Sequence, residues 1–225
     1  MAAQLSCQRQ VLSRQLSVFS KDEGREGSRP FCFWTIGVRI SHVPIDPIFE
    51  RVFQKLYGMP CWGVEYRVGS GIVLEFGDPH LVIREPSTAR PKASRRVREL
   101  FAKRGVTVRG QWRLWIWMCN WEIFHKGKRL GGDQARSNLQ PIVHSLDGQN
   151  LIRFSIGSRR HRYVFEFDLG GVLVTHPWGP DDDQWMLFEP SGFVLTARGN
   201  NKFSYHRSNQ PLDAGPWKPI FVRTE

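Results

Sequence analysis

The stretch VRGQWRLWIWMCNWEIF, residues 108–124, decides the fold because it is the richest apolar and aromatic run of the chain. Aromatic and β-branched residues favour strands, so we predict a single strand over residues 112–124. Successive side chains of a strand point to opposite faces. One predicted face carries Trp112, Leu114, Ile116, Met118, Asn120, Glu122 and Phe124, and the other carries Arg113, Trp115, Trp117, Cys119, Trp121 and Ile123. Both faces are apolar in the middle, which is typical of a central strand covered on both sides.

The tryptophans of this strand have two interpretations. The pattern favours a place in the core. In the alternative, Trp115, Trp117 and Trp121 form an exposed row beside Arg109 and Arg113. Nucleic-acid bases stack on such aromatic rows, with about 1–3 kcal/mol for each base. Exposure of the three indoles separates the two interpretations.

Two helices are predicted around the strands. Asp46 is a good N-cap, Pro47 fits the first helical position, and Gly58 ends the helix. Its apolar side chains recur at helical spacing, from Ile48 to Leu56. A second helix is predicted from Ser137 to Gly148.

Short strands separated by turn residues make up most of the remaining chain. Residues 31–40 predict a strand and residues 63–86 a meander, and the final third reads as a run of hairpins. The fold class is therefore mostly β (α+β), an antiparallel meander sheet or partly open barrel with two packed helices. Residues 31–225 are predicted to form one globular domain.

Residues 1–30 are expected to be a poorly ordered tail, with an organelle-targeting segment or an extension from a misassigned start as alternatives. No apolar run reaches the roughly 18–20 residues of a membrane-spanning helix. The four cysteines stand alone and suit buried, reduced thiols, so the cytoplasm is the expected location.

A basic segment at 84–109 is the sharpest functional signal. Its nine basic residues against Glu85 and Glu99 leave a local charge of +7, out of +11 for the chain. Ser94–Arg104 is predicted to form a short helix with a thin buried apolar stripe and a basic face. A nucleic-acid site is hypothesised on Arg95, Arg96, Arg98, Lys103, Arg104, Arg109, Arg113, Trp115 and Trp117. The alternative is a solvated segment that keeps the protein soluble.

Catalytic motifs do not stand out, and no catalytic residue or cofactor is predicted. A divalent-metal hydrolase built on the 176–183 loop is a further alternative, with His176, Asp181 and Asp183 as ligands. Glu122 and Glu166 interrupt apolar faces, so burial with a shifted pKa is one expectation. Pairing with Arg113 or Arg153 is the other.

Four stretches of the chain resemble a family of small bacterial proteins of unknown function. They are LEFGDPHLVIREP, VRGQWRLWIWMCNWEIF, YVFEFDLGGVLVTHPW and QWMLFEPSGFVLTARGNNKFSYH, within about residues 60–210. The resemblance implies a bacterial origin but no activity, cofactor or site residue. The segment 88–104 departs from it as a longer basic linker.

The sequence therefore predicts a non-enzymatic binding protein. Its partner is a protein, a small ligand in the concave face of the sheet, or a polyanion. Sequence-tolerant nucleic-acid binding through residues 84–109 is the second hypothesis, and it predicts affinity that falls steeply with salt.

Overall fold

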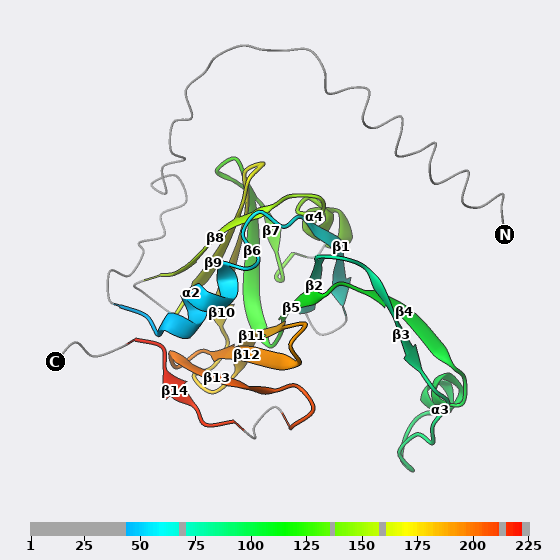
Figure 1. The fold of residues 1–225 in the computed structure, drawn as a ribbon. Helices are drawn as coiled ribbons and strands as arrows, with labels where there is room; N and C mark the ends of the chain where they lie inside the picture. The colour runs from blue at the N-terminus through cyan, green and yellow to red at the C-terminus, as the bar shows by residue number, and fades with distance from the viewer. Residues whose placement is uncertain (1–43, 68–70, 136–137, 158–160, 212–214, 222–225) are drawn as a thin grey trace. The chain divides into compact units, whose positions relative to one another are not determined.

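The computed structural model describes residues 44–67, 71–135, 138–157, 161–211 and 215–221 (Figure 1). These residues form mainly antiparallel strands with three short helices, so the predicted mostly β (α+β) class is confirmed. The predictions for residues 1–30 and for a strand at 31–40 lie outside the described residues.

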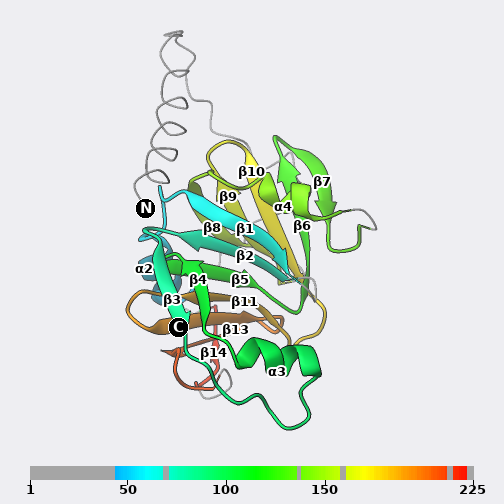
Figure 2. The same cartoon turned by 90° about the vertical axis from the view of Figure 1, so that its right-hand side faces the viewer.

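The larger sheet has seven strands in the order β1-β2-β5-β11-β12-β13-β14 (Figure 2). The strands are β1 (Cys61–Arg67), β2 (Gly71–Phe76), β5 (Trp112–Ile116), β11 (Asp183–Phe188), β12 (Phe193–Arg198), β13 (Lys202–Arg207) and β14 (Lys218–Pro219). The predicted C-terminal hairpins are confirmed here, since β11, β12 and β13 pair in sequence.

The smaller sheet has five strands in the order β7-β6-β10-β9-β8. The strands are β6 (Cys119–His125), β7 (Lys128–Gly132), β8 (Leu151–Ile156), β9 (Tyr163–Phe167) and β10 (Gly171–Pro177). Side chains from both sheets belong to one buried core cluster, and the described sheets do not close into a barrel.

The single strand predicted at 112–124 is wrong, because the chain changes sheets in its middle. Strand β5 ends at Ile116 in the larger sheet, and β6 begins at Cys119 in the smaller one. Met118 adopts a positive φ of 49° at the corner. The corner shifts the alternation by one position, so Ile116 and Cys119 both point into the core.

The helix predicted at 46–58 is confirmed at its start as α2 (Pro47–Phe53). The carboxylate of Asp46 accepts a hydrogen bond from the Ile48 amide at 2.9 Å, as an N-cap should. Phe49 and Phe53 are fully buried and pack on Phe154 of β8 and Trp185 of β11. This one helix therefore ties together the aromatic side chains of both sheets.

The second predicted helix is shorter than expected. Helix α4 spans only Gln140–His144 and contacts β1 and β7, one strand from each sheet. Leu139 at its N-cap offers no side-chain acceptor, and Oδ1 of Asn138 instead accepts a hydrogen bond from the Gln140 amide at 3.2 Å. Turns rather than helix carry the chain on to Gly148, yet Val143 and Leu146 are fully buried.

The predicted meander at 63–86 is correct for its first two strands only. Strand β1 pairs antiparallel with β2, but β3 (His80–Arg84) leaves the sheet and pairs with β4 (Gly105–Arg109). The resulting two-stranded sheet shares no strand with the other two. Gly77, with a φ of +75°, begins the connection between β2 and β3.

Cys61 and Cys119 are buried free thiols, as predicted. Burial raises the pKa of Cys61 to about 12 and raises the pKa of Cys119 as well. Both therefore carry their proton at neutral pH, which leaves them unreactive as nucleophiles. Cys7 and Cys32 lie outside the described residues.

Candidate binding surface

Residues 80–109 form an excursion from the larger sheet that we call the arm. It consists of β3, the helix α3 (Arg95–Phe101) and β4 (Figure 1). Strands β2 and β5 pair as far as Phe76 and Trp112, and the arm begins with the pair His80 and Arg109. The arm is thus the continuation of the β2–β5 ladder beyond the sheet.

A buried carboxylate joins the arm to the sheet. Glu75 of β2 is only 4% exposed and accepts hydrogen bonds from the Gly110 amide at 3.1 Å and from Nη1 of Arg109 at 3.2 Å. Nε of Arg113 lies 3.5 Å from the same carboxylate. Burial, followed by the charge of Arg109, lowers the pKa of Arg113. Glu75 therefore balances the charge of two arginines and accepts a hydrogen bond from one backbone amide, at the point where the β2–β5 pairing ends and the arm begins.

Gly110 is required at this junction. A Cβ there would lie 2.5 Å from the Phe76 carbonyl oxygen and 2.8 Å from its nitrogen. Backbone atoms cannot yield to such an overlap as a flexible side chain can. The backbones of Gly110 and Phe76 therefore lie in close contact at the base of the arm.

The ribbon formed by β3 and β4 has two chemically different faces. Opposite residues of an antiparallel pair share a face. The pairs Leu81–Val108 and Ile83–Val106 give one face of four aliphatic side chains, each 54–64% exposed. We call these four residues the aliphatic face. Arg84 and Arg109 fall on the opposite face.

The far end of the arm is the helix α3. Oγ of its N-cap, Ser94, accepts a hydrogen bond from the Val97 amide at 3.4 Å. Arg84 holds the other end, with Nη2 donating to the Leu100 carbonyl at 2.7 Å and to the Lys103 carbonyl at 3.2 Å. The helix is shorter than the predicted Ser94–Arg104.

The predicted burial of an apolar stripe on this helix is wrong. Val97, Leu100 and Phe101 are 38%, 57% and 39% exposed, and none of the helical residues is buried. The spacing is helical, but the arm brings no second layer against it. Arg84 lies over the Phe101 ring, 5.0 Å from its centroid, which leaves most of the stripe open.

The basic residues of the arm divide into paired and unpaired groups. Arg95 pairs with Glu99 at 2.8 Å and Arg104 with Glu85 at 3.0 Å, both on exposed surface. Within the described residues, six cations of the arm make no ion pair. Arg84 binds backbone carbonyls, and the other five are Arg90, Lys92, Arg96, Arg98 and Lys103. The charge at this end of the arm is thus largely uncompensated.

The predicted nucleic-acid residues form two groups, one at each end of the arm. Arg95, Arg96, Arg98, Lys103 and Arg104 lie on or beside α3. Arg109, Arg113, Trp115 and Trp117 lie at the base. A five-residue ribbon of about 16 Å separates the groups, at roughly 3.3 Å for each residue.

The predicted tryptophan row is only partly present. Trp115 and Trp117 are half-buried, with ring centroids 4.7 Å apart, and Arg113 lies 5.7 Å from the Trp115 ring centroid. Trp121 is fully buried in the core, because the corner at Met118 reverses the direction of its side chain. Trp112 and Trp121 lie in the core. Outside the core only the pair of Trp115 and Trp117 remains, in place of the predicted row of three.

The 176–183 loop does not bring its three hypothesised metal ligands together. His176 contacts Glu122 at 3.1 Å, Asp181 accepts from Asn200 at 2.8 Å, and Asp183 pairs with Arg198 at 2.8 Å. Across the described ranges, no group of three or more His, Cys, Asp or Glu side chains is placed to hold a metal ion.

Both strand carboxylates noted in the sequence are in ion pairs. Arg153 binds Glu166 through two hydrogen bonds of 2.6 and 2.9 Å, and burial raises the pKa of Glu166 against the effect of that arginine. The expected Arg113–Glu122 pair is absent because the two residues lie in different sheets. Burial raises the pKa of Glu122, but the opposite effect of Arg129 and His176 is larger, so the pKa of this carboxyl is lowered overall.

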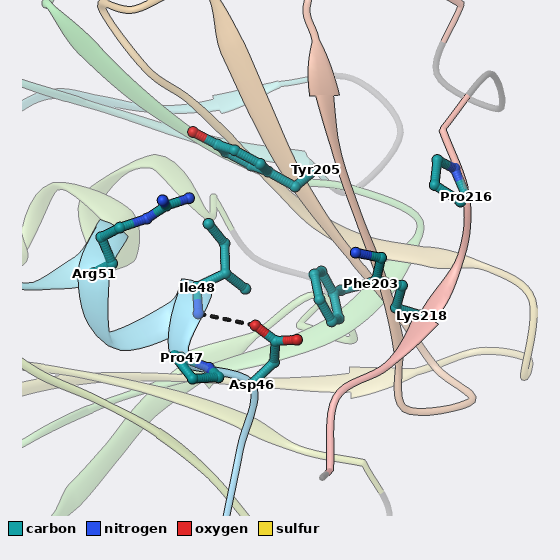
Figure 3. Close-up of a pocket in the computed structure, with 8 residues that line it drawn as sticks. All are labelled: Asp46, Pro47, Ile48, Arg51, Phe203, Tyr205, Pro216 and Lys218. Atoms are coloured by element: carbon teal, nitrogen blue, oxygen red, sulfur yellow. Dashed lines mark hydrogen bonds between the residues drawn. The ribbon is translucent and has the colours of Figure 1, made fainter.

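A pocket of about 440 Å³ lies between α2, β13 and β14 (Figure 3). Asp46 and Arg51 from the helix side face Phe203, Tyr205 and Lys218. Asp46 already caps α2, and Arg51 lies 5.7 Å from the Tyr205 ring centroid. Burial, followed by Glu189, raises the pKa of Tyr205 to about 12, so its hydroxyl stays protonated.

Comparison of the chain with protein-family models, curated proteins and solved structures finds no match. The resemblance to a bacterial family therefore stays a prediction. Among the described residues, no helix is both long and apolar enough to cross a membrane.

Sequence reasoning missed Glu75 and the aliphatic face. The aliphatic residues of HLVIR and VTVR were visible, but an aliphatic strand predicts burial and does not show whether anything covers it.

Proposed function

We propose that this protein is a non-enzymatic binding module whose arm docks on phosphate-bearing polyanions. The observation that carries the proposal is the group of five cations in and beside α3 that make no ion pair among the described residues, Arg90, Lys92, Arg96, Arg98 and Lys103. A surface with this excess of one charge attracts polyanions and raises their rate of association. Nucleic acid and phospholipid surfaces both present the required phosphodiester groups.

The base of the arm offers support for a bound polyanion. Arg113 lies 5.7 Å from the Trp115 ring centroid of the half-buried Trp115–Trp117 pair, and Arg109 shares the carboxylate of Glu75 with Arg113. Their guanidinium groups are already shared with Glu75, so they contribute less charge than the distal group. The distal cations are therefore expected to supply most of the affinity.

The test measures polarisation of a labelled, unstructured oligonucleotide titrated with the protein. We would use about 50 and 200 mM salt, a range over which several phosphate contacts lose much of their affinity. The variant Arg96→Gln/Arg98→Gln/Lys103→Gln removes three of the unpaired cations. The expected result is a loss of roughly tenfold or more in affinity at the lower salt, with a shallower salt dependence.

The matched control removes three exposed lysines outside the arm, Lys126, Lys128 and Lys202, by the same change to Gln. Both variants lose the same net charge, and neither removes a buried group. Equal loss of affinity in the two variants would attribute binding to net charge alone and contradict a role for the arm.

A further inference from the structure

The exposed apolar side chains of this protein gather on the arm. Eight of the thirteen exposed large apolar residues among those described belong to it. They are Leu81, Val82, Ile83, Val97, Leu100, Phe101, Val106 and Val108. Scattered exposed aliphatics are ordinary, but four that adjoin on one face of a ribbon, as Leu81, Ile83, Val106 and Val108 do, mark a surface that another body covers.

The aliphatic face has no support from its own fold. A two-stranded ribbon is marginally stable in water unless something packs on it. The described elements place nothing on the aliphatic face, since Leu81, Ile83, Val106 and Val108 are all more than half exposed. The face carries no charge, while the nine basic residues of the segment lie on the opposite face or around α3.

We propose that the aliphatic face of the arm docks on the surface of an anionic phospholipid bilayer. This assignment rests on the proposed function and names its partner. A bilayer interface offers anionic phosphates for the cations and an acyl boundary for the aliphatic side chains, at adjacent depths. The long stems of Arg96, Arg98 and Lys103 suit this position, because such side chains bury their stems and keep the charge at the headgroups.

Charge complementarity and apolar area together favour a bilayer over nucleic acid. Nucleic acid satisfies the cations but has little use for a continuous aliphatic face. Proteins that insert apolar side chains into a groove place individual wedges between base steps. A second copy of the arm would instead bring two segments of charge +7 together.

The experiment measures co-sedimentation of the full chain with phosphatidylcholine vesicles that contain phosphatidylserine, and with phosphatidylcholine vesicles alone. The oligonucleotide titration runs in parallel. The expected result is that the protein binds the vesicles that contain phosphatidylserine and does not bind the vesicles of pure phosphatidylcholine. This binding should persist in part at 200 mM salt, because apolar insertion is not screened, whereas oligonucleotide affinity falls steeply over about the same range.

The decisive variant is Leu81→Thr/Ile83→Thr/Val108→Thr, which keeps residues that favour strands. Its matched control is Leu130→Thr/Ile152→Thr/Leu169→Thr, three exposed aliphatics outside the arm. The arm variant should lose vesicle partitioning about tenfold or more while its oligonucleotide affinity stays unchanged. The control should bind vesicles as the unmodified protein does.

Two outcomes overturn the bilayer assignment alone: oligonucleotide binding without vesicle binding, or vesicle binding that the arm variant retains. The first leaves phosphate docking in place with nucleic acid as the partner. Failure to bind either probe overturns both proposals.

Discussion

Strands β2 and β3 lie three residues apart in the chain and have opposite environments. GIVLEF of β2 is buried at all six positions, whereas HLVIR of β3 is exposed at all five. Both are rich in branched aliphatic residues. Strand β2 lies between β1 and β5 in a sheet that packs on a core, and β3 pairs with β4 alone. Similar sequences thus form a buried strand in one place and an exposed strand in the other.

The difference teaches that an aliphatic strand has side chains that need a cover, while the sequence does not show whether they have one. In β2 the cover comes from the same chain, through the core cluster that both sheets share. In the arm the described residues supply none. The comparison therefore divides the apolar residues into those that stabilise the fold and those available to a partner.

The largest expected effect is a difference in the free energy of unfolding between two Leu→Ala variants. Leu74→Ala in β2 should lower the free energy of unfolding by about 2–5 kcal/mol, because it leaves a cavity at a fully buried position. Leu81→Ala in the arm should change it by less than about 0.5 kcal/mol. Urea unfolding of both variants checks this. A similar cost at both sites would show that the arm is packed in solution.

The next effect compares two glutamates. Glu75→Gln should destabilise the protein by about 2–4 kcal/mol, because the half-buried Arg109 and Arg113 lose the buried carboxylate that is their counter-charge. Glu85→Gln removes an exposed partner of Arg104 and should cost less than about 0.5 kcal/mol. Thermal or urea unfolding of the two variants measures the gap, and equal values would contradict the role given to Glu75.

The smallest effect is a pH dependence in the sheets. Burial, followed by the charge of Arg162, lowers the pKa of His176. The unfolded chain therefore binds this proton more readily, and stability is lost as the pH falls below about 6.5, the unperturbed histidine value. His176→Asn should flatten the fall in unfolding midpoint between pH 7 and pH 5.5.

His80→Asn, at the exposed start of the arm, is the control for this titration. It should leave the slope of the unmodified protein intact. An unchanged slope in the His176 variant would assign the pH dependence to another group.

Some of the fold followed from local chemistry. Asp46 and Pro47 marked the start of α2, Ser94 the start of α3, and the turn residues separated the C-terminal hairpins. These signals act within a few residues of the chain, so sequence alone contains them. The basic character of residues 84–109 was equally visible, because charge is read directly from composition.

Other features depended on partners distant in sequence. The continuous pattern of residues 108–124 gave no sign of the corner at Met118, because the residues on both sides favour strands equally. Only the pairing of β5 with β11 and of β6 with β10 divides the run. The hypothesised metal ligands likewise share a loop, but each binds a different partner.

The sequence by itself determined the mostly β class, the helix starts and the site of the excess charge, since these depend on residue type and short-range spacing. The tertiary structure decided that Trp121 is buried in the core while Trp115 and Trp117 stay half-buried outside it. It also decided that Glu75 joins the arm to the sheet and that the aliphatic face stays open. These outcomes depend on which strands pair, and pairing is settled by burial across the whole chain rather than by any single segment.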